Sequence, residues 1–121
     1  MKHLLSINNF KKSEIVHLLT ASSNIKANPQ KYRTRLKNSI IATLFFEPST
    51  RTRLSFESAA LRLGAKVIGF ADAATSSTKK GETLEDTIKI VSGYADAIVM
   101  RHYETGAAAR AASVAGVPVI N

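Results

Sequence analysis

The chain has 121 residues, of which 45% are hydrophobic and 21% charged, a composition expected of one folded globular domain. No apolar run approaches the roughly 18 to 20 residues that a membrane-spanning helix needs, and the N-terminus lacks the pattern of a secretory signal. The absence of cysteine excludes a disulfide framework and thiolate metal sites. We therefore expect a cytoplasmic protein with no membrane partner.

The net charge of +8 favours a partner that is negatively charged, either a nucleic acid or a small polyanionic substrate. The basic residues are scattered along the chain, with local density only at residues 31–37 and at Lys79 and Lys80. Tyr32 is the single aromatic residue within these two clusters, so they lack the repeated stacking platforms that bases would need. The small substrate is the favoured interpretation, no nucleic-acid partner is expected, and much of the charge is interpreted as a solvated face.

The first predicted helix is amphipathic. Ser13 is a candidate N-cap, and the apolar residues between Ile15 and Ile25 recur close to the helical period. The helix is expected to end before Asn28. The run from 40 to 46 is short, apolar and β-rich, which predicts a strand covered on both faces as in a parallel sheet.

A second helix is predicted after this strand, because apolar residues from Leu54 to Leu63 follow helical spacing. Gly64 stands where a left-handed C-terminal cap belongs. Residues 65–70 are expected to form the second strand. The small and polar residues from 71 to 82 are typical of a long loop.

Strands and helices continue to alternate in the last third of the chain. Thr83, followed three residues later by Asp86, resembles a capping box at the start of a helix. Residues 97–100 are predicted to form a strand, 106–115 a helix and 117–120 a strand. This alternation predicts an α/β fold with a parallel sheet flanked by helices, whose ligands bind at the carboxyl ends of the strands.

The corner between the first strand and the second helix is a candidate anion-binding site. Ser49 stands at the N-cap position, where free backbone N–H groups and the positive end of the helix dipole converge. Hydroxyls of Ser49, Thr50 and Thr52 add donors, and the planar fork of Arg51 matches a phosphate. The alternative is that Ser49 merely caps the helix while Arg51 and Arg53 are solvated, since cations in the first turn oppose the dipole.

Three further features are weaker candidates. Arg101 follows the third strand and is expected at the same edge of the sheet as the corner, although such an arginine is often only a surface charge. His102 is interpreted as a solvated neighbour rather than a general base. The segment from Lys79 to Glu82 is either a solvated basic turn or an anion clamp, and its place on a long loop favours the clamp.

With these residues in hand, the chain resembles the N-terminal, carbamoyl-phosphate-binding domain of aspartate carbamoyltransferases over its whole length. Ornithine carbamoyltransferases share the Ser-Thr-Arg-Thr-Arg corner, so that corner alone indicates only the wider family. The lysine-rich loop before Gly81 is similar to the aspartate branch. The residues that carry the resemblance are Phe45 to Glu57, Lys79 to Thr83, and Val99 to His102.

The resemblance implies roles for particular residues. Ser49, Thr50, Arg51 and Thr52 would hold the phosphate of carbamoyl phosphate, while Thr52 and Arg101 would reach its carbonyl oxygen. Ser76 and Lys80 would enter the active site of the adjacent subunit of a homotrimer, and a regulatory chain would be a further partner. The catalytic set implied is Arg51, Thr52, Arg101 and Lys80.

The resemblance also implies a reaction. The amine of L-aspartate would attack the carbonyl to give N-carbamoyl-L-aspartate and phosphate in pyrimidine biosynthesis, with no metal or cofactor. Residues 1–121 would be the carbamoyl-phosphate-binding domain, cut at its C-terminal end, with the aspartate-binding domain absent. We expect such a chain to be inactive alone and to expose an apolar face that the family's last helix covers. An ornithine-type domain, or a non-catalytic module that binds phosphate or nucleic acid, remains the alternative.

Overall fold

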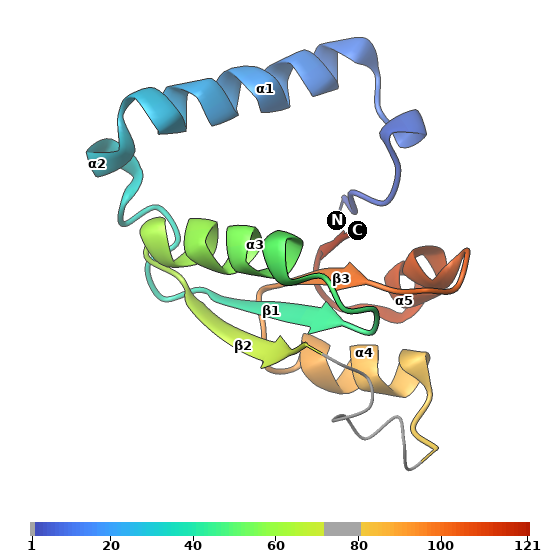
Figure 1. The fold of residues 1–121 in the computed structure, drawn as a ribbon. Coiled ribbons are helices and arrows are strands. Elements are labelled where there is room, and N and C mark those ends of the chain that lie inside the picture. The colour runs from blue at the N-terminus through green and yellow to red at the C-terminus, as the bar shows by residue number, and fades with distance from the viewer. Residues whose placement is uncertain (1, 72–80) are drawn as a thin grey trace.

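The computed structural model describes residues 2–71 and 81–121. The elements alternate between helix and strand after the first forty residues (Figure 1). In chain order they are a 3-10 helix η1 at Ile7–Asn9, α1 at Lys12–Ala27, α2 at Pro29–Tyr32, β1 at Ile40–Phe45, α3 at Thr50–Arg62, β2 at Lys66–Phe70, α4 at Leu84–Ser92, β3 at Ala97–Arg101, α5 at Ala107–Val114 and β4 at Val119–Ile120.

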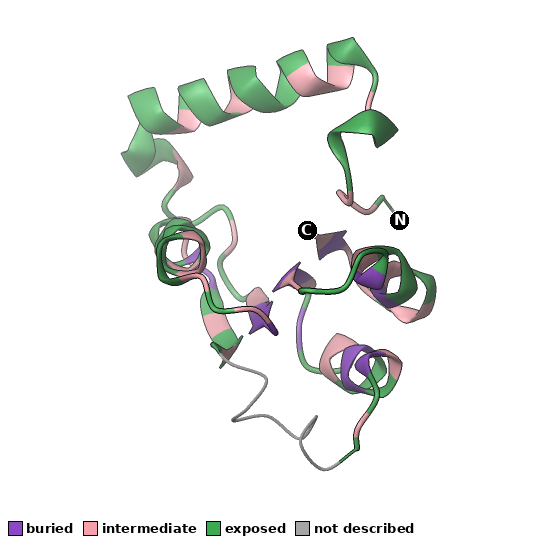
Figure 2. Cartoon of the chain, turned by 45° about the vertical axis from the view of Figure 1, so that its right-hand side comes forward, coloured by how far each residue is buried: buried purple, intermediate pink, exposed green. Residues whose placement is uncertain are grey.

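The strands form one parallel sheet in the order β2-β1-β3-β4. Figure 2 shows α3 on one face of this sheet and α4 and α5 on the other. The predicted α/β fold with a parallel sheet flanked by helices is therefore confirmed. The chain leaves β1 toward one face and β3 toward the other, so a crevice opens between the carboxyl ends of these two neighbouring strands, where sheets of this kind bind ligands.

The core lies mainly between the sheet and the pair α4 and α5. Alternate residues of β1, Ala42 and Leu44, point to this side and pack with Ile88 of α4 and Ala111 of α5, all of which are almost fully buried. On the opposite face Thr43 is also fully buried, and its hydroxyl is a hydrogen-bond donor to the Glu57 carboxylate of α3 at 2.9 Å. Burial on both faces holds the end of β1 in a fixed position.

The predicted C-terminal cap of α3 and the predicted N-cap of α4 are both confirmed. Gly64 has φ of +91°, and the N–H groups of Gly64 and Ala65 bond to the carbonyls of Leu61 and Ala60 at 3.0 Å each, which is a Schellman cap. At the start of α4, the hydroxyl of Thr83 accepts a hydrogen bond from the Asp86 N–H at 3.1 Å.

The prediction for the start of α1 was wrong, because the N-cap is Lys11 and Ser13 lies inside the first turn. The carboxylate of Glu14 accepts a hydrogen bond from the Lys11 N–H at 2.8 Å, so this side chain closes the helix end that the Ser13 hydroxyl was expected to close. No residue of α1 is buried, and Figure 2 shows this helix in the colours of exposed and intermediate residues. The side chain of Leu19 is 64% exposed. Among the residues that the structure describes, no helix is long and apolar enough to span a membrane.

The N-terminal residues lie beside the C-terminal residues, along the β4 edge of the sheet (Figure 1). Leu4 forms a parallel bridge with Ile120, and its N–H donates to the Val119 carbonyl at 2.8 Å. The Nδ1 atom of His3 accepts a hydrogen bond from the Val119 N–H at 3.1 Å. The short strand β4 is thus paired on both sides.

Candidate functional site

The N-terminal turn of α3 presents free backbone donors at the carboxyl end of β1. Ser49 occupies the N-cap position as predicted, but its hydroxyl makes no capping hydrogen bond. The first helical bond runs from the Arg53 N–H to the Ser49 carbonyl at 3.0 Å, so the N–H groups of Thr50, Arg51 and Thr52 have no acceptor within the helix. An uncapped helix start of this kind is ready to bind an anion.

A hollow of about 710 Å³ lies over this turn. Five of its lining residues, Ser49, Thr50, Arg51, Thr52 and Arg101, were predicted as site residues, and the structure brings them together. Their predicted roles toward a ligand are not tested by this placement. The remaining sequence candidates, Ser76 and Lys80, lie outside the described residues, as does Lys79.

Ser55 also lines the hollow, and the sequence analysis missed it. It follows Thr52 by three residues, a spacing that places both side chains on the same face of a helix. Its hydroxyl donates a hydrogen bond to the Thr52 carbonyl at 2.8 Å. The helical spacing from Thr52 was the available signal.

Arg101 reaches the corner from β3, because Phe45 and Arg101 are paired in the parallel register. Its Nε and Nη2 atoms each donate to a carboxylate oxygen of Glu47 at 3.2 Å, and Nη1 donates to the Ser49 hydroxyl at 3.2 Å. These hydrogen bonds lower the pKa of Glu47 and raise that of Arg101. Glu47 was not predicted as a partner, although strand register alone brings the two together.

The two arginines of the corner have different environments. Arg51 is exposed, borders the hollow and forms no ion pair with any described residue. Arg53 pairs with Glu57 at 3.2 Å, and the same carboxylate oxygen accepts the Thr43 hydroxyl. Glu57 therefore links α3 to the sheet and engages Arg53, while the guanidinium of Arg51 is available to a ligand.

His102 is half-buried, unlike the solvated neighbour that the sequence suggested. Its ring centroid lies 4.9 Å from that of Phe46 and 4.4 Å from that of Tyr103. Its Nδ1 atom accepts a hydrogen bond from the Glu104 N–H at 3.0 Å. A second hollow of about 310 Å³, bordered by Thr52 and Arg101, reaches this ring.

Burial lowers the pKa of His102, and the negative charge of Glu104 opposes the shift more weakly. We expect a titration of the ring protons by NMR to give a midpoint below the usual value near 6.5. In Glu104→Gln the midpoint should fall further, because the carboxylate that favours the imidazolium is gone. A midpoint above 6.5 would contradict the packing described for this ring.

The sheet order and the uncapped helix start define a class of protein, the parallel α/β domains with a candidate ligand site at the carboxyl edge of the sheet. Comparison with known proteins narrows this class. A family model for the aspartate/ornithine carbamoyltransferase carbamoyl-P binding domain matches residues 2–121, and the chain belongs to this family.

The relatives at high identity are aspartate carbamoyltransferases. The chain is 54% identical over 120 residues to the catalytic subunit from Bacteroides thetaiotaomicron, covering 99% of this chain and 38% of that protein. The catalytic subunit of M. jannaschii aspartate transcarbamoylase superposes with a TM-score of 0.92 at 48% identity, covering 100% of this chain and 40% of that chain.

A third relative was solved in complex with two small molecules. It is the aspartate transcarbamoylase of Trypanosoma cruzi in complex with carbamoyl phosphate and aspartate, with a TM-score of 0.89 at 38% identity. The match covers 99% of this chain and 40% of that chain. The chain thus spans about two fifths of the length of its relatives.

Proposed function

We propose that residues 1–121 form the carbamoyl-phosphate-binding domain of a cytoplasmic aspartate carbamoyltransferase. The observation that carries the proposal is the hollow at the start of α3, which Arg51 and Arg101 border together with four hydroxyl-bearing residues. The relatives favour aspartate over ornithine as the acceptor, since those named above are aspartate enzymes. Because the chain spans about two fifths of their length, we assign it only the carbamoyl-phosphate side of the reaction.

The phosphate group of the substrate would sit at the N-terminus of α3. There the free N–H groups of the first turn, the hydroxyls of Ser49, Thr50 and Thr52, and the fork of Arg51 offer donors from several directions. The carbonyl oxygen would then point toward Arg101 and Thr52, which border both hollows.

The amine nitrogen of L-aspartate attacks the carbonyl carbon, the bond from that carbon to the phosphate oxygen breaks, and the nitrogen loses a proton. Negative charge builds on the carbonyl oxygen and on the leaving phosphate. Cations and hydroxyls fixed beside both groups stabilise that charge, and binding orients the reacting atoms. The products are N-carbamoyl-L-aspartate and phosphate. This reaction is an early step of pyrimidine biosynthesis.

Arg101 must change partners for this role. Without substrate, Glu47 engages it through two hydrogen bonds, whereas a carbonyl oxygen bound in the hollow would compete for the same N–H groups. Both side chains are partly exposed, at 43% for Arg101 and 39% for Glu47, so water screens the pair and exchange is inexpensive.

The same proposal includes the assembly. Ser76 and Lys80 would complete the site of an adjacent subunit in a homotrimer, and regulatory chains could attach to it. These assignments rest on the family resemblance alone.

A titration separates this proposal from a nucleic-acid-binding module. Carbamoyl phosphate and inorganic phosphate should each bind the 121-residue chain in a saturable manner. Tight binding of a short single-stranded oligonucleotide that weakens steeply with salt, without any response to carbamoyl phosphate, would refute the proposed function.

A further inference from the structure

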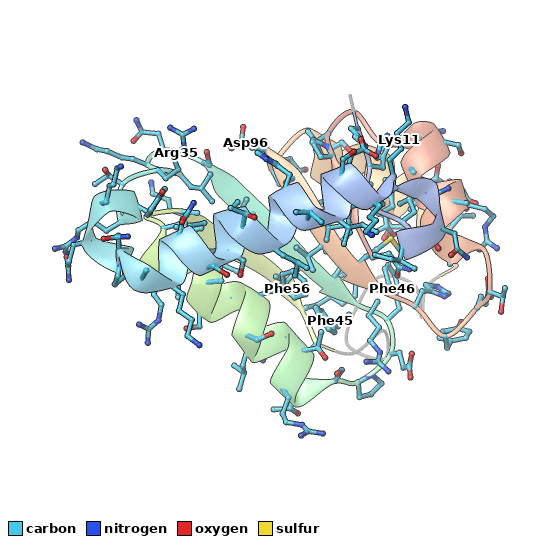
Figure 3. The ribbon with its side chains drawn as sticks, turned by 90° about the horizontal axis from the view of Figure 1, so that it is seen from above. Lys11, Arg35, Phe45, Phe46, Phe56 and Asp96 are labelled. Carbon is cyan, nitrogen blue, oxygen red and sulfur yellow. The ribbon has the colours of Figure 1, made fainter. Side chains whose placement is uncertain are left out.

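The apolar contacts of α3 with the sheet are few. Within this helix, all of which the structure describes, only Ala60 is buried, and Phe56 is 36% exposed. Figure 3 shows Phe56 near Phe45 of β1, and both side chains border the second hollow. Because apolar packing has no preferred direction, these contacts alone would let the helix slide or turn on the sheet.

A polar link joins the same side of α3 to β1. Arg53, Glu57 and Ala60 follow one another at intervals of four and three residues, which places them on one face of the helix. One carboxylate oxygen of Glu57 accepts the Thr43 hydroxyl at 2.9 Å and the Arg53 Nη1–H at 3.2 Å. Thr43 is fully buried, and the Glu57 side chain is only 20% exposed. Because hydrogen bonds are directional, this link fixes where α3 lies along the sheet and how it is rotated.

The neighbouring strand β2 holds the Thr43 end of this link in place. Thr43 pairs with Gly69, whose φ of +150° is a conformation that residues with side chains rarely adopt. A Cβ atom at Gly69 would overlap the carbonyl oxygen and the hydroxyl oxygen of Thr43. Besides Glu57, the Ile68 carbonyl is within reach of the hydroxyl, at 3.5 Å. The close approach of the two strands therefore gives the link a rigid anchor on the sheet.

The candidate site is divided between two elements that this link places relative to each other. The free N–H groups belong to α3, whereas Arg101 belongs to β3, the neighbour of β1. Thr43 precedes by two residues Phe45, which is paired with Arg101, so the link lies roughly 7 Å along β1 from the level of Arg101. A direct hydrogen bond from Arg101 Nη1 to the Ser49 hydroxyl also joins the two parts, but a ligand bound to Arg101 would compete with it.

We infer that Thr43 and Glu57 are positioning residues for the carbamoyl phosphate site, an inference that rests on the proposed function. Neither residue borders the two hollows at the site, so neither would touch the ligand. Their link holds the start of α3 at the separation from Arg101 that carbamoyl phosphate spans, with its phosphate on α3 and its carbonyl oxygen at Arg101. Inorganic phosphate needs only the groups on α3. Loss of the link should therefore weaken binding of carbamoyl phosphate and spare binding of inorganic phosphate.

The experiment measures the affinities of carbamoyl phosphate and inorganic phosphate for Thr43→Val by calorimetry. Valine has nearly the shape of threonine but lacks the hydroxyl that donates to Glu57. We expect carbamoyl phosphate to bind about tenfold more weakly, the effect of losing one charge-assisted hydrogen bond at Arg101. Binding of inorganic phosphate should be nearly unchanged. Thr43→Ser keeps a hydroxyl and should restore the original ratio of the two affinities, which a purely structural role of Thr43 would not alter.

The matched control is Thr87→Val in α4, on the other face of the sheet. Thr87 is also buried, and its hydroxyl donates to the Thr83 carbonyl at 3.1 Å, so the same chemical change should leave both affinities unchanged. Thermal unfolding checks that each variant folds. If Thr43→Val does not fold, Glu57→Leu breaks the same link and leaves the Ile68 carbonyl as an acceptor for the Thr43 hydroxyl. That variant should also lose affinity for carbamoyl phosphate relative to inorganic phosphate.

Two results would overturn the inference and leave the proposed function intact. In the first, the folded variant that lacks the link binds both ligands as the original chain does. In the second, both affinities fall by the same factor, which shows that the link stabilises the fold without setting the separation of α3 from Arg101. A different result would remove the proposed function and the inference together: the original chain binds inorganic phosphate but does not bind carbamoyl phosphate.

Discussion

Replacing Arg51 with alanine should abolish measurable binding of carbamoyl phosphate while the domain stays folded. Arg51 is exposed, borders the hollow and has no ion pair among the described residues, so its removal takes little from the folded state. In a catalytic chain of the relatives' full length, losing one such donor should reduce turnover by ~10² to 10³. Calorimetry on the 121-residue chain and steady-state kinetics on the full-length chain measure the two effects.

Two further variants sharpen this test. Arg51→Lys keeps the positive charge but loses the bidentate fork, so its affinity should fall between those of the original chain and Arg51→Ala. Lys89→Ala removes an exposed cation of α4 and should bind carbamoyl phosphate normally. Equal affinity in Arg51→Ala and the original chain, with both folded, would show that the start of α3 is not the site.

Mixing two inactive variants of the full-length chain should restore activity. The proposal places Lys80 in the active site of the neighbouring subunit, so Arg51→Ala and Lys80→Ala damage each site from different chains. When the two variants are reassembled into mixed trimers, the cyclic arrangement leaves one site free of both substitutions. The measurement is carbamoyltransferase activity before and after mixing, and we expect activity to appear only after mixing.

The control for this experiment is the double variant Arg51→Ala, Lys80→Ala mixed with the original chain. It shows how much activity the original chain contributes to mixed trimers. If Arg51 and Lys80 served the same chain's site, every site in trimers of the two single variants would keep one lesion. Persistent inactivity in verified mixed trimers would then reject the shared site.

The alternation of strands and helices was predictable because its signals are local. The apolar run that became β1, the Gly64 cap and the Thr83 cap each depend on residues a few positions apart. The start of α1 was misassigned because Ser13 was placed at the N-cap on the general preference of serine for that position. Glu14, three residues after Lys11, indicated the observed start of the helix, because a glutamate at this spacing can accept a hydrogen bond from the N-cap backbone N–H.

The candidate site was only partly predictable, because its details arise from contacts between distant segments. Ser49 was expected to cap α3, but its hydroxyl makes no capping hydrogen bond and accepts one from the Arg101 guanidinium of the neighbouring strand. The pairing of Arg101 with Glu47 depends on the register of β1 and β3, which no single segment reveals. The predictions for Ser76 and Lys80 stay untested, since these residues lie outside the described ranges.

The central claim is that carbamoyl phosphate binds at the start of α3, and backbone amide NMR tests it most directly. On addition of carbamoyl phosphate, the largest shifts should occur at the amides of Thr50, Arg51 and Thr52, whose N–H groups have no acceptor within the helix. The side-chain Nε–H of Arg101 should shift as well, as it leaves Glu47 for the ligand. Saturation without shifts at these groups, or with shifts confined to another part of the chain, would contradict the account.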